Sequence, residues 1–163
     1  MGAAVLRGGR VTNRSKRKGT SFETACVRFL RGRLQDDRIE RRALHGSRDM
    51  GDLYGLRAHG FEGIAECKDH AQWGPADLAR WREQTVAERG NADADFSLLV
   101  IHKAGVGGRN FGRNICQMQV RDLMRVMGGE MTCLAGETAM DVWVQVDLEA
   151  ACQMIEGVYD AEQ

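Results

Sequence analysis

A near-continuous apolar run over residues 96–103 decides the fold class of this chain more than any other segment. Extended segments without polar alternation are typical of strands that are buried on both faces of a sheet. The chain has 163 residues, which is enough for one domain with one core. Helical and strand patterns follow one another along the sequence, so we expect a layered α/β domain.

The residues before this run predict a helix, three strands and a second helix. The first helix is expected from Thr20, where Glu23 completes a capping box, to about Leu34. Short glycine-bearing turns separate the three strands, and this close spacing predicts an antiparallel meander. The second helix is expected from Pro75 to Gly90. The three strands are expected at about residues 38–44, 52–56 and 61–68.

The residues after the run predict smaller elements and three parts of the chain. A glycine-rich loop is expected at residues 105–114 and a strand at 115–120, followed by a helix at 122–127. Strands at 131–134 and 142–146 and a helix at 148–155 complete the chain. We expect a basic flexible arm over residues 1–19 and a core over residues 20–120. Residues 121–163 are expected to form an acidic extension of mixed α/β structure on the same domain.

The zero net charge of the chain hides a segregation of charge along it. Residues 1–48 carry 13 Lys and Arg against 4 Asp and Glu, whereas residues 49–163 carry 10 against 19. The two parts therefore have formal charges of +9 and −9. The balanced total argues against a simple polycationic binder, but the basic part indicates a polyanionic partner.

The five cysteines are scattered and never form a C-x-x-C pair. This pattern excludes a simple zinc ribbon and predicts reduced thiols rather than a disulfide framework. The longest apolar stretch is too short to span a bilayer, and the first ten residues do not resemble a signal peptide. We therefore expect a cytoplasmic protein without a membrane partner.

The residues from Gly46 to Lys68 are those that we expect to carry chemistry. Residues two apart on a strand share a face, so Glu66 and Lys68 project together, and Asp52 on the neighbouring strand can reach Glu66. Two carboxylates beside an ammonium suit a hard divalent cation, which can activate water and stabilise charge on a phosphate oxygen. On this pattern alone, however, a simple cross-strand ion pair on a solvated face is the more common outcome.

Several short motifs in a fixed order resemble those of the archaeal-type Holliday junction resolvases, which belong to the PD-(D/E)xK nuclease superfamily. The motifs lie within about residues 14–104 and are Lys18-Gly19-x-x-x-Glu23, Gly46-Ser47, Asp52-Leu53 and Ile64-x-Glu66-x-Lys68. The resemblance implies a restriction-endonuclease-like core, in which a helix, a three-strand antiparallel meander, a second helix and a further strand follow one another. It also implies a DNA endonuclease that depends on Mg²⁺ or Mn²⁺.

The resemblance implies a role for each matching residue. The implied catalytic residues are Glu23, Asp52, Glu66 and Lys68. The implied metal ligands are the carboxylates of Glu23, Asp52 and Glu66 and the backbone carbonyl of Cys67. Asp49 is a rival to Asp52, although only Asp52 is followed by an apolar strand. Gln84 resembles a helical glutamine that lies near the metal in some superfamily nucleases, and its alternative is an ordinary surface glutamine.

Basic side chains supply the expected contacts to DNA, because Lys and Arg bind phosphates without reading the sequence. The expected basic contacts are Arg14, Lys16, Arg17, Lys18, Arg48, Arg109 and Arg113, and the resemblance adds Ser47. Contacts of this kind suit an enzyme that selects branched DNA by its structure. A homodimer is implied, because a four-way junction offers two equivalent strands to cut. No small-molecule cofactor is expected.

Three alternatives are consistent with the same residues. A restriction-type nuclease would prefer linear duplex with a defined sequence. A nuclease of the same superfamily could also act on flaps or replication forks. A non-catalytic DNA-binding protein would use the acidic residues only to balance nearby arginines, and it would cleave no DNA with any divalent ion.

Overall fold

The computed structural model describes residues 13–43, 49–129 and 140–157, with side chains from Arg17 onward. Its first half contains α1 (Asn13–Leu34), β1 (Glu40–Arg41), β2 (Leu53–Ala58), β3 (Phe61–Lys68), α2 (Pro75–Asn91) and β4 (Phe96–Ile101). Its second half contains the 3₁₀ helix η1 (Gly108–Arg113), β5 (Ile115–Gln119), α3 (Val120–Val126), β6 (Trp143–Asp147) and α5 (Leu148–Glu156). None of the described helices is long and apolar enough to cross a membrane.

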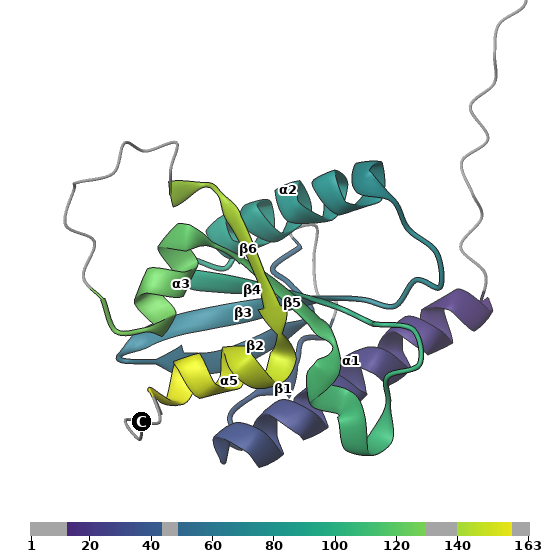
Figure 1. The fold of residues 1–163 in the computed structure, drawn as a ribbon, viewed down its shortest axis with the longest axis horizontal. Coiled ribbons are helices and arrows are strands. Elements are labelled where there is room, and N and C mark those ends of the chain that lie inside the picture. Colours follow the sequence, from purple (N-terminus) through teal and green to yellow (C-terminus); the bar gives the residue numbers. More distant parts are fainter. Residues whose placement is uncertain (1–12, 44–48, 130–139, 158–163) are drawn as a thin grey trace, which may run out of the picture.

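The six strands form one mixed sheet in the order β1-β2-β3-β4-β5-β6 (Figure 1). The pairs β1/β2 and β2/β3 are antiparallel, as the meander predicted. β4 then runs parallel to β3, and α2 is the crossover between the two strands. β5 and β6 are each antiparallel to the strand before them. The expectation of an α/β domain is therefore confirmed.

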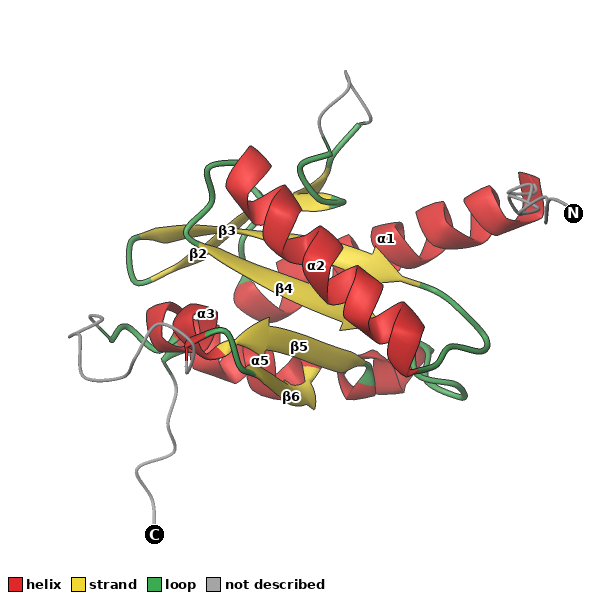
Figure 2. Cartoon of the chain, turned by 90° about the horizontal axis from the view of Figure 1, so that it is seen from above, coloured by secondary structure: helices red, strands yellow, loops and turns green. Residues whose placement is uncertain are grey.

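Helices cover both faces of the sheet, with α2 on one face and α1 and α5 on the other (Figures 1 and 2). All six residues of β4 are buried, and they serve the two faces alternately. Leu98 and Val100 join the core under α1 and α5, whereas Leu99 and Ile101 pack with Trp81 of α2. This burial on both faces is what the apolar run predicted.

The chain beyond residue 120 belongs to the same domain. β6 extends the sheet, and α5 packs against α1. Asp122 of α3 is fully buried and accepts hydrogen bonds from Arg89 of α2 at 2.5 Å and from Ser97 of β4 at 3.1 Å. The acidic extension is thus held by the core through both packing and a buried ion pair.

The structure corrects the expected start of the first helix. α1 begins at Asn13, so residues 13–19 are helical rather than part of a flexible arm. Thr20 lies inside the helix, where its carbonyl accepts a hydrogen bond from Thr24 Oγ1 at 2.7 Å, and it does not cap the helix. Lys and Arg are good helix formers even without an apolar face, which explains the longer helix. Residues 1–12 and the strand expected at 131–134 lie outside the described residues.

Most other boundaries agree with the sequence to within a few residues. β3 covers residues 61–68 as expected, whereas β1 is only two residues long, shorter than the expected 38–44. The glycine-rich loop contains η1, which packs on α1 through Phe111 and its neighbours Phe22 and Phe29. The described cysteines, Cys26, Cys67, Cys116 and Cys152, are free and buried, in agreement with reduced thiols.

β2 lies very close to the residues before β1. Any side chain at Gly55 is therefore expected to destabilise the fold. Gly55 has φ of 84°, and a Cβ atom there would overlap the carbonyl group of Arg38. We expect Gly55→Ala to lower the free energy of unfolding by about 2–4 kcal/mol in urea denaturation. Gly60→Ala is the matched control, because φ is 89° but the space around it is open, and it should cost only about 1 kcal/mol. Equal losses in the two variants would contradict the close approach.

Candidate active site

Glu66 and Lys68 lie side by side at the end of β3, on the face covered by α2. Lys68 Nζ donates a hydrogen bond to Glu66 Oε1 at 2.5 Å. Both side chains are largely buried, and Glu66 is only 4% exposed. The alternation of the strand sends Cys67 to the opposite face, where its thiol meets Cys26 of α1. The pair is therefore not an ion pair on a solvated face.

Asp52 reaches this pair from the residue before β2. Leu53 is paired with Ala65 in the sheet, so Asp52 lies beside Glu66 on the neighbouring strand. Its Oδ2 accepts a hydrogen bond from the backbone N–H of Cys67 at 2.9 Å, which fixes the carboxylate. Asp49, the rival, is exposed at the surface, where its carbonyl accepts a hydrogen bond from Asn91 at 2.7 Å. The structure thus brings Asp52, and not Asp49, to Glu66 and Lys68.

Glu23 completes the group from α1. Burial raises its pKa, and the nearby charge of Asp52 raises it further, whereas Arg41 opposes this rise. The Arg41 Nη1 atom lies 3.3 Å from Glu23 Oε2. All four residues that the resemblance implied as catalytic therefore lie near one another, although they come from three elements of the chain.

The pKa values of the two central carboxyl groups are raised strongly. Burial is the main cause for Asp52, and the charge of Glu66 adds to it, so that its pKa rises from 3.8 to about 7. Burial likewise raises the pKa of Glu66 to about 7, against the opposing charge of Lys68. Two carboxylates in one buried site repel each other, and a single lysine offsets only part of that repulsion.

α2 adds two residues, Gln84 and Glu88, to this site. Gln84 Oε1 accepts a hydrogen bond from Lys68 Nζ at 2.9 Å, so Gln84 is not an ordinary surface glutamine. Its amide nitrogen donates to Glu66 Oε1 at 3.2 Å and to Glu88 Oε1 at 2.7 Å. Gln84 therefore orients the ammonium and both carboxylates at once.

Glu88 is the site residue that the sequence reasoning missed. It is only 1% exposed, burial raises its pKa, and its Oε2 atom has no hydrogen-bond partner in the part of the chain that the structure describes. Its position was nevertheless visible in the sequence. Trp81, Gln84, Thr85 and Glu88 follow helical spacing, and Trp81, Thr85 and Glu88 are buried in α2.

The chemistry of the donor set fits a divalent cation. Asp52, Glu66 and Glu23 offer carboxylate oxygens whose mutual repulsion a cation would relieve, and Mg²⁺ needs only one or two carboxylates beside its waters. Among the described residues, no three Asp, Glu, His or Cys side chains are preformed as a ligand set. Lys68 holds Glu66 Oε1, so an ion would have to share or replace this contact.

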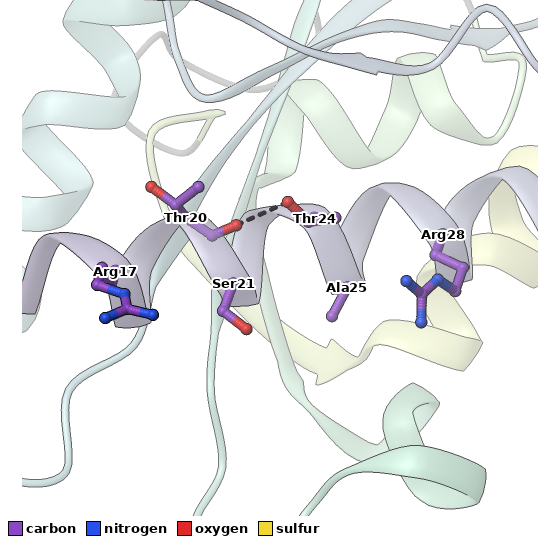
Figure 3. A pocket seen from close by; sticks show the side chains of 6 residues that line it. All are labelled: Arg17, Thr20, Ser21, Thr24, Ala25 and Arg28. Atoms are coloured by element: carbon purple, nitrogen blue, oxygen red, sulfur yellow. Dashed lines mark hydrogen bonds between the residues drawn. The ribbon is translucent and has the colours of Figure 1, made fainter. Parts of the chain in front are cut away.

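The expected DNA contacts lie partly on α1 and η1. Arg17 and Lys18 are exposed on α1, and Arg109 and Arg113 are exposed on η1, which Phe111 ties to α1. Figure 3 shows Arg17 and Arg28 at the two ends of a row of small side chains on α1. Arg14 and Lys16 lie in the first turns of α1, but their side chains are outside the described part. Ser47 and Arg48 lie outside the described residues altogether.

Comparison of the chain with models of known protein families, with curated proteins and with solved structures finds no match. The function must therefore be argued from the side chains of this site and their surroundings.

The raised pKa of Asp52 predicts that its charge destabilises the fold. Because the folded state binds this proton more tightly, the associated stability is present below about pH 4 and is lost as the pH rises through about 7. In urea denaturation near pH 8, we expect the free energy of unfolding of Asp52→Asn to exceed that of the wild type by about 1–2 kcal/mol. Near pH 4 the two proteins should have equal free energies of unfolding. The Asn side chain can still accept the hydrogen bond from Cys67.

Asp36→Asn is the control for this experiment. Arg38 lowers the pKa of Asp36 through hydrogen bonds, so ionised Asp36 contributes stability that is present above its unfolded pKa. Asp36→Asn should therefore be less stable than the wild type near pH 8. An Asp52→Asn protein that also loses stability near pH 8 would contradict the assignment of Asp52 as a destabilising charge.

Proposed function

We propose that this protein is a metal-dependent, structure-selective DNA endonuclease that resolves Holliday junctions by phosphodiester hydrolysis. The observation that carries the proposal is the contact between the Lys68 ammonium and Glu66, with Asp52 and Glu23 beside them in one partly buried site. A partly buried group of three carboxylates and one ammonium has little structural value by itself, because it is costly to desolvate. Hydrolysis of a phosphodiester gives each of these groups a use.

For the fold of this α/β domain we propose a restriction-endonuclease-like core, and the order of its elements supports this proposal. α1, the antiparallel strands β1 to β3, the crossover helix α2 and the parallel strand β4 follow one another as the resemblance implies. Asp52 lies immediately before β2, Glu66 and Lys68 lie towards the end of β3, and Glu23 lies on α1. These are the positions in which the motifs of that superfamily are expected.

Each residue of the site has a proposed role. Glu23, Asp52 and Glu66, together with the backbone carbonyl of Cys67, would hold Mg²⁺ or Mn²⁺. The bound cation would lower the pKa of a water molecule and neutralise charge on the scissile phosphate. Lys68 orients the attacking water and stabilises the negative charge that develops on the phosphate.

Gln84 and Glu88 have a supporting role in this proposal. Gln84 is hydrogen-bonded to both Lys68 Nζ and Glu66 Oε1 and so fixes their relative position. Glu88 in turn accepts a hydrogen bond from the amide nitrogen of Gln84. The amide orientation is fixed because its oxygen faces an ammonium and its nitrogen faces two carboxyl groups. The amide oxygen of Gln84 and the carboxylate of Glu66 therefore hold the Lys68 ammonium together.

Branched DNA is the proposed substrate, bound by a homodimer in the cytoplasm without a small-molecule cofactor. The exposed basic residues on α1 and η1 support binding to phosphates, which carries no sequence information. A two-fold symmetric dimer would present two such sites to the two equivalent strands of a four-way junction.

Cleavage of a labelled synthetic four-way junction with Mg²⁺ tests the proposal. We expect Asp52→Asn and Glu66→Gln to lower the cleavage rate by about 100-fold or more, because each removes a charge that the reaction uses. Glu83→Gln is the matched control, since Glu83 is exposed on the same helix as Gln84 and should leave the rate unchanged.

Equal rates in the wild type, Asp52→Asn and Glu66→Gln would contradict the site. Preference for a linear duplex with a defined sequence would instead favour a restriction-type nuclease, and preference for flaps or forks a nuclease of that class. Binding of DNA without strand scission under any divalent ion would favour a non-catalytic DNA-binding protein.

Divalent cations should also stabilise the fold through this site. A ligand that binds only the folded state raises the melting temperature, and the stabilisation grows with the logarithm of its concentration above its Kd. We expect Mg²⁺ or Mn²⁺ to raise the Tm of the wild type in differential scanning fluorimetry, relative to sodium chloride of equal ionic strength. The rise should be absent in Glu66→Gln and retained in Glu83→Gln. An equal rise in both variants would show that cations bind elsewhere.

A further inference from the structure

A cavity lined by several charged side chains lies near the candidate active site. It has a volume of about 260 Å³ and opens between β2, the start of β3 and the residues that follow α2. Arg38, Arg42 and Arg57 line it, together with Tyr54. Small residues, including Gly55, Ala92 and Ala94, also line it.

Arg42 is the residue of this cavity whose hydrogen bonds are incomplete. Its backbone N–H donates to the carbonyl of Asp52 at 2.7 Å, and its guanidinium lies 5.0 Å above the ring of Tyr54. The Nε atom of Arg42 is buried, and the described residues supply no acceptor for it. A buried charged donor without an acceptor is unfavourable, so a ligand that supplies an acceptor would bind here with advantage.

The two other arginines of the cavity already have carboxylate partners. Arg38 contacts Asp36 at 2.7 Å, and Arg57 contacts Glu62 at 2.5 Å. In the described part of the chain, no carboxylate pairs with Arg42 in this way. The cavity therefore combines three arginines with two acidic residues, and Arg42 is the arginine for which the described residues supply no carboxylate partner.

We propose that this cavity binds a phosphate group on Arg42. A guanidinium donates two parallel hydrogen bonds to a phosphate, and stacking on Tyr54 fixes its plane. The volume corresponds to roughly eight water molecules, which is enough for a phosphate and part of an attached sugar. Glu62 and Asp93 also line the cavity, and these acids favour a phosphodiester over a more highly charged polyphosphate.

The position of the cavity makes a DNA strand the favoured source of this phosphate, an extension that rests on the proposed nuclease function. Ile64 lines the cavity, and Glu66 lies two residues further along the same face of β3. Two residues of a strand span about 7 Å. The backbone of Arg42 is hydrogen-bonded to that of Asp52, so a DNA strand cut at this site and passing the edge of the sheet at β1 would place a flanking phosphate at Arg42.

The first experiment titrates the wild-type protein with inorganic phosphate, so it does not depend on nuclease activity. Side-chain ¹⁵N–¹H spectra report each arginine Nε–H, and Arg42→Lys identifies the Arg42 signal. We expect this signal to shift in a saturable way with phosphate but not with chloride at equal ionic strength. Arg31 is the internal control, because its Nε already donates to the carbonyl of Ile39 at 2.6 Å and should not respond.

The second experiment measures binding of a four-way junction in Ca²⁺ at several salt concentrations. We expect Arg42→Gln to weaken binding at least threefold and to reduce the salt slope by about 0.9, the value for one lost phosphate contact. Arg80→Gln is the matched control, since Arg80 is exposed on α2 and paired with Asp77, and it should change neither quantity.

Together the two experiments separate the sources of the phosphate. A loss of junction affinity specific to Arg42→Gln supports a DNA strand as the ligand. A saturable shift of Arg42 without such a loss supports a free phosphate or nucleotide, and it stands even if the protein binds no DNA and the proposed function fails. No saturable shift, together with no loss of junction affinity specific to Arg42→Gln, overturns the proposal.

Discussion

The parallel pairing of β3 with β4 is the constraint on which the rest of the structure depends. Parallel neighbours cannot be joined by a tight turn, so the chain must cross over, and α2 is this crossover. Because β4 is buried on both faces, α2 has to cover the face opposite α1. The same connection that completes the core therefore carries Gln84 and Glu88 to Glu66.

The alternation of β3 divides its residues between stability and chemistry. Ala65 and Cys67 join the core under α1, whereas Glu66 and Lys68 face α2. Placing the ionised carboxylates in this site is unfavourable, because burial raises the pKa values of both Asp52 and Glu66 to about 7. Lys68 and Gln84 offset part of this cost, and Glu88 Oε2 has no partner among the described residues. Polar groups that a fold leaves unsatisfied are commonly those that its function requires.

The sequence predicted those helices and strands in which buried apolar side chains repeat at helical or strand spacing. β3, β4 and α2 have this property, and the grouping of Asp52, Glu66 and Lys68 then followed from strand geometry. The start of α1 could not be read in this way, because residues 13–19 have no apolar face and their helix follows from backbone propensity. Glu88 was missed because an acidic residue on a helix is normally solvated. Only the packing of α2 against β4 makes it a buried one.

The segregation of charge along the chain also acquires a different meaning in the fold. Arg33 of α1 contacts Glu149 and Glu156 of α5, both at 2.6 Å, so part of the basic excess holds the acidic extension in place. Arg31, Arg38 and Arg41 likewise have carboxylate partners close by. The positive charge available to a polyanion is therefore smaller than the formal +9 and is confined to particular surfaces. Arg17 and Lys18 on α1, and Arg42 beside the site, are more informative about the partner than the total charge.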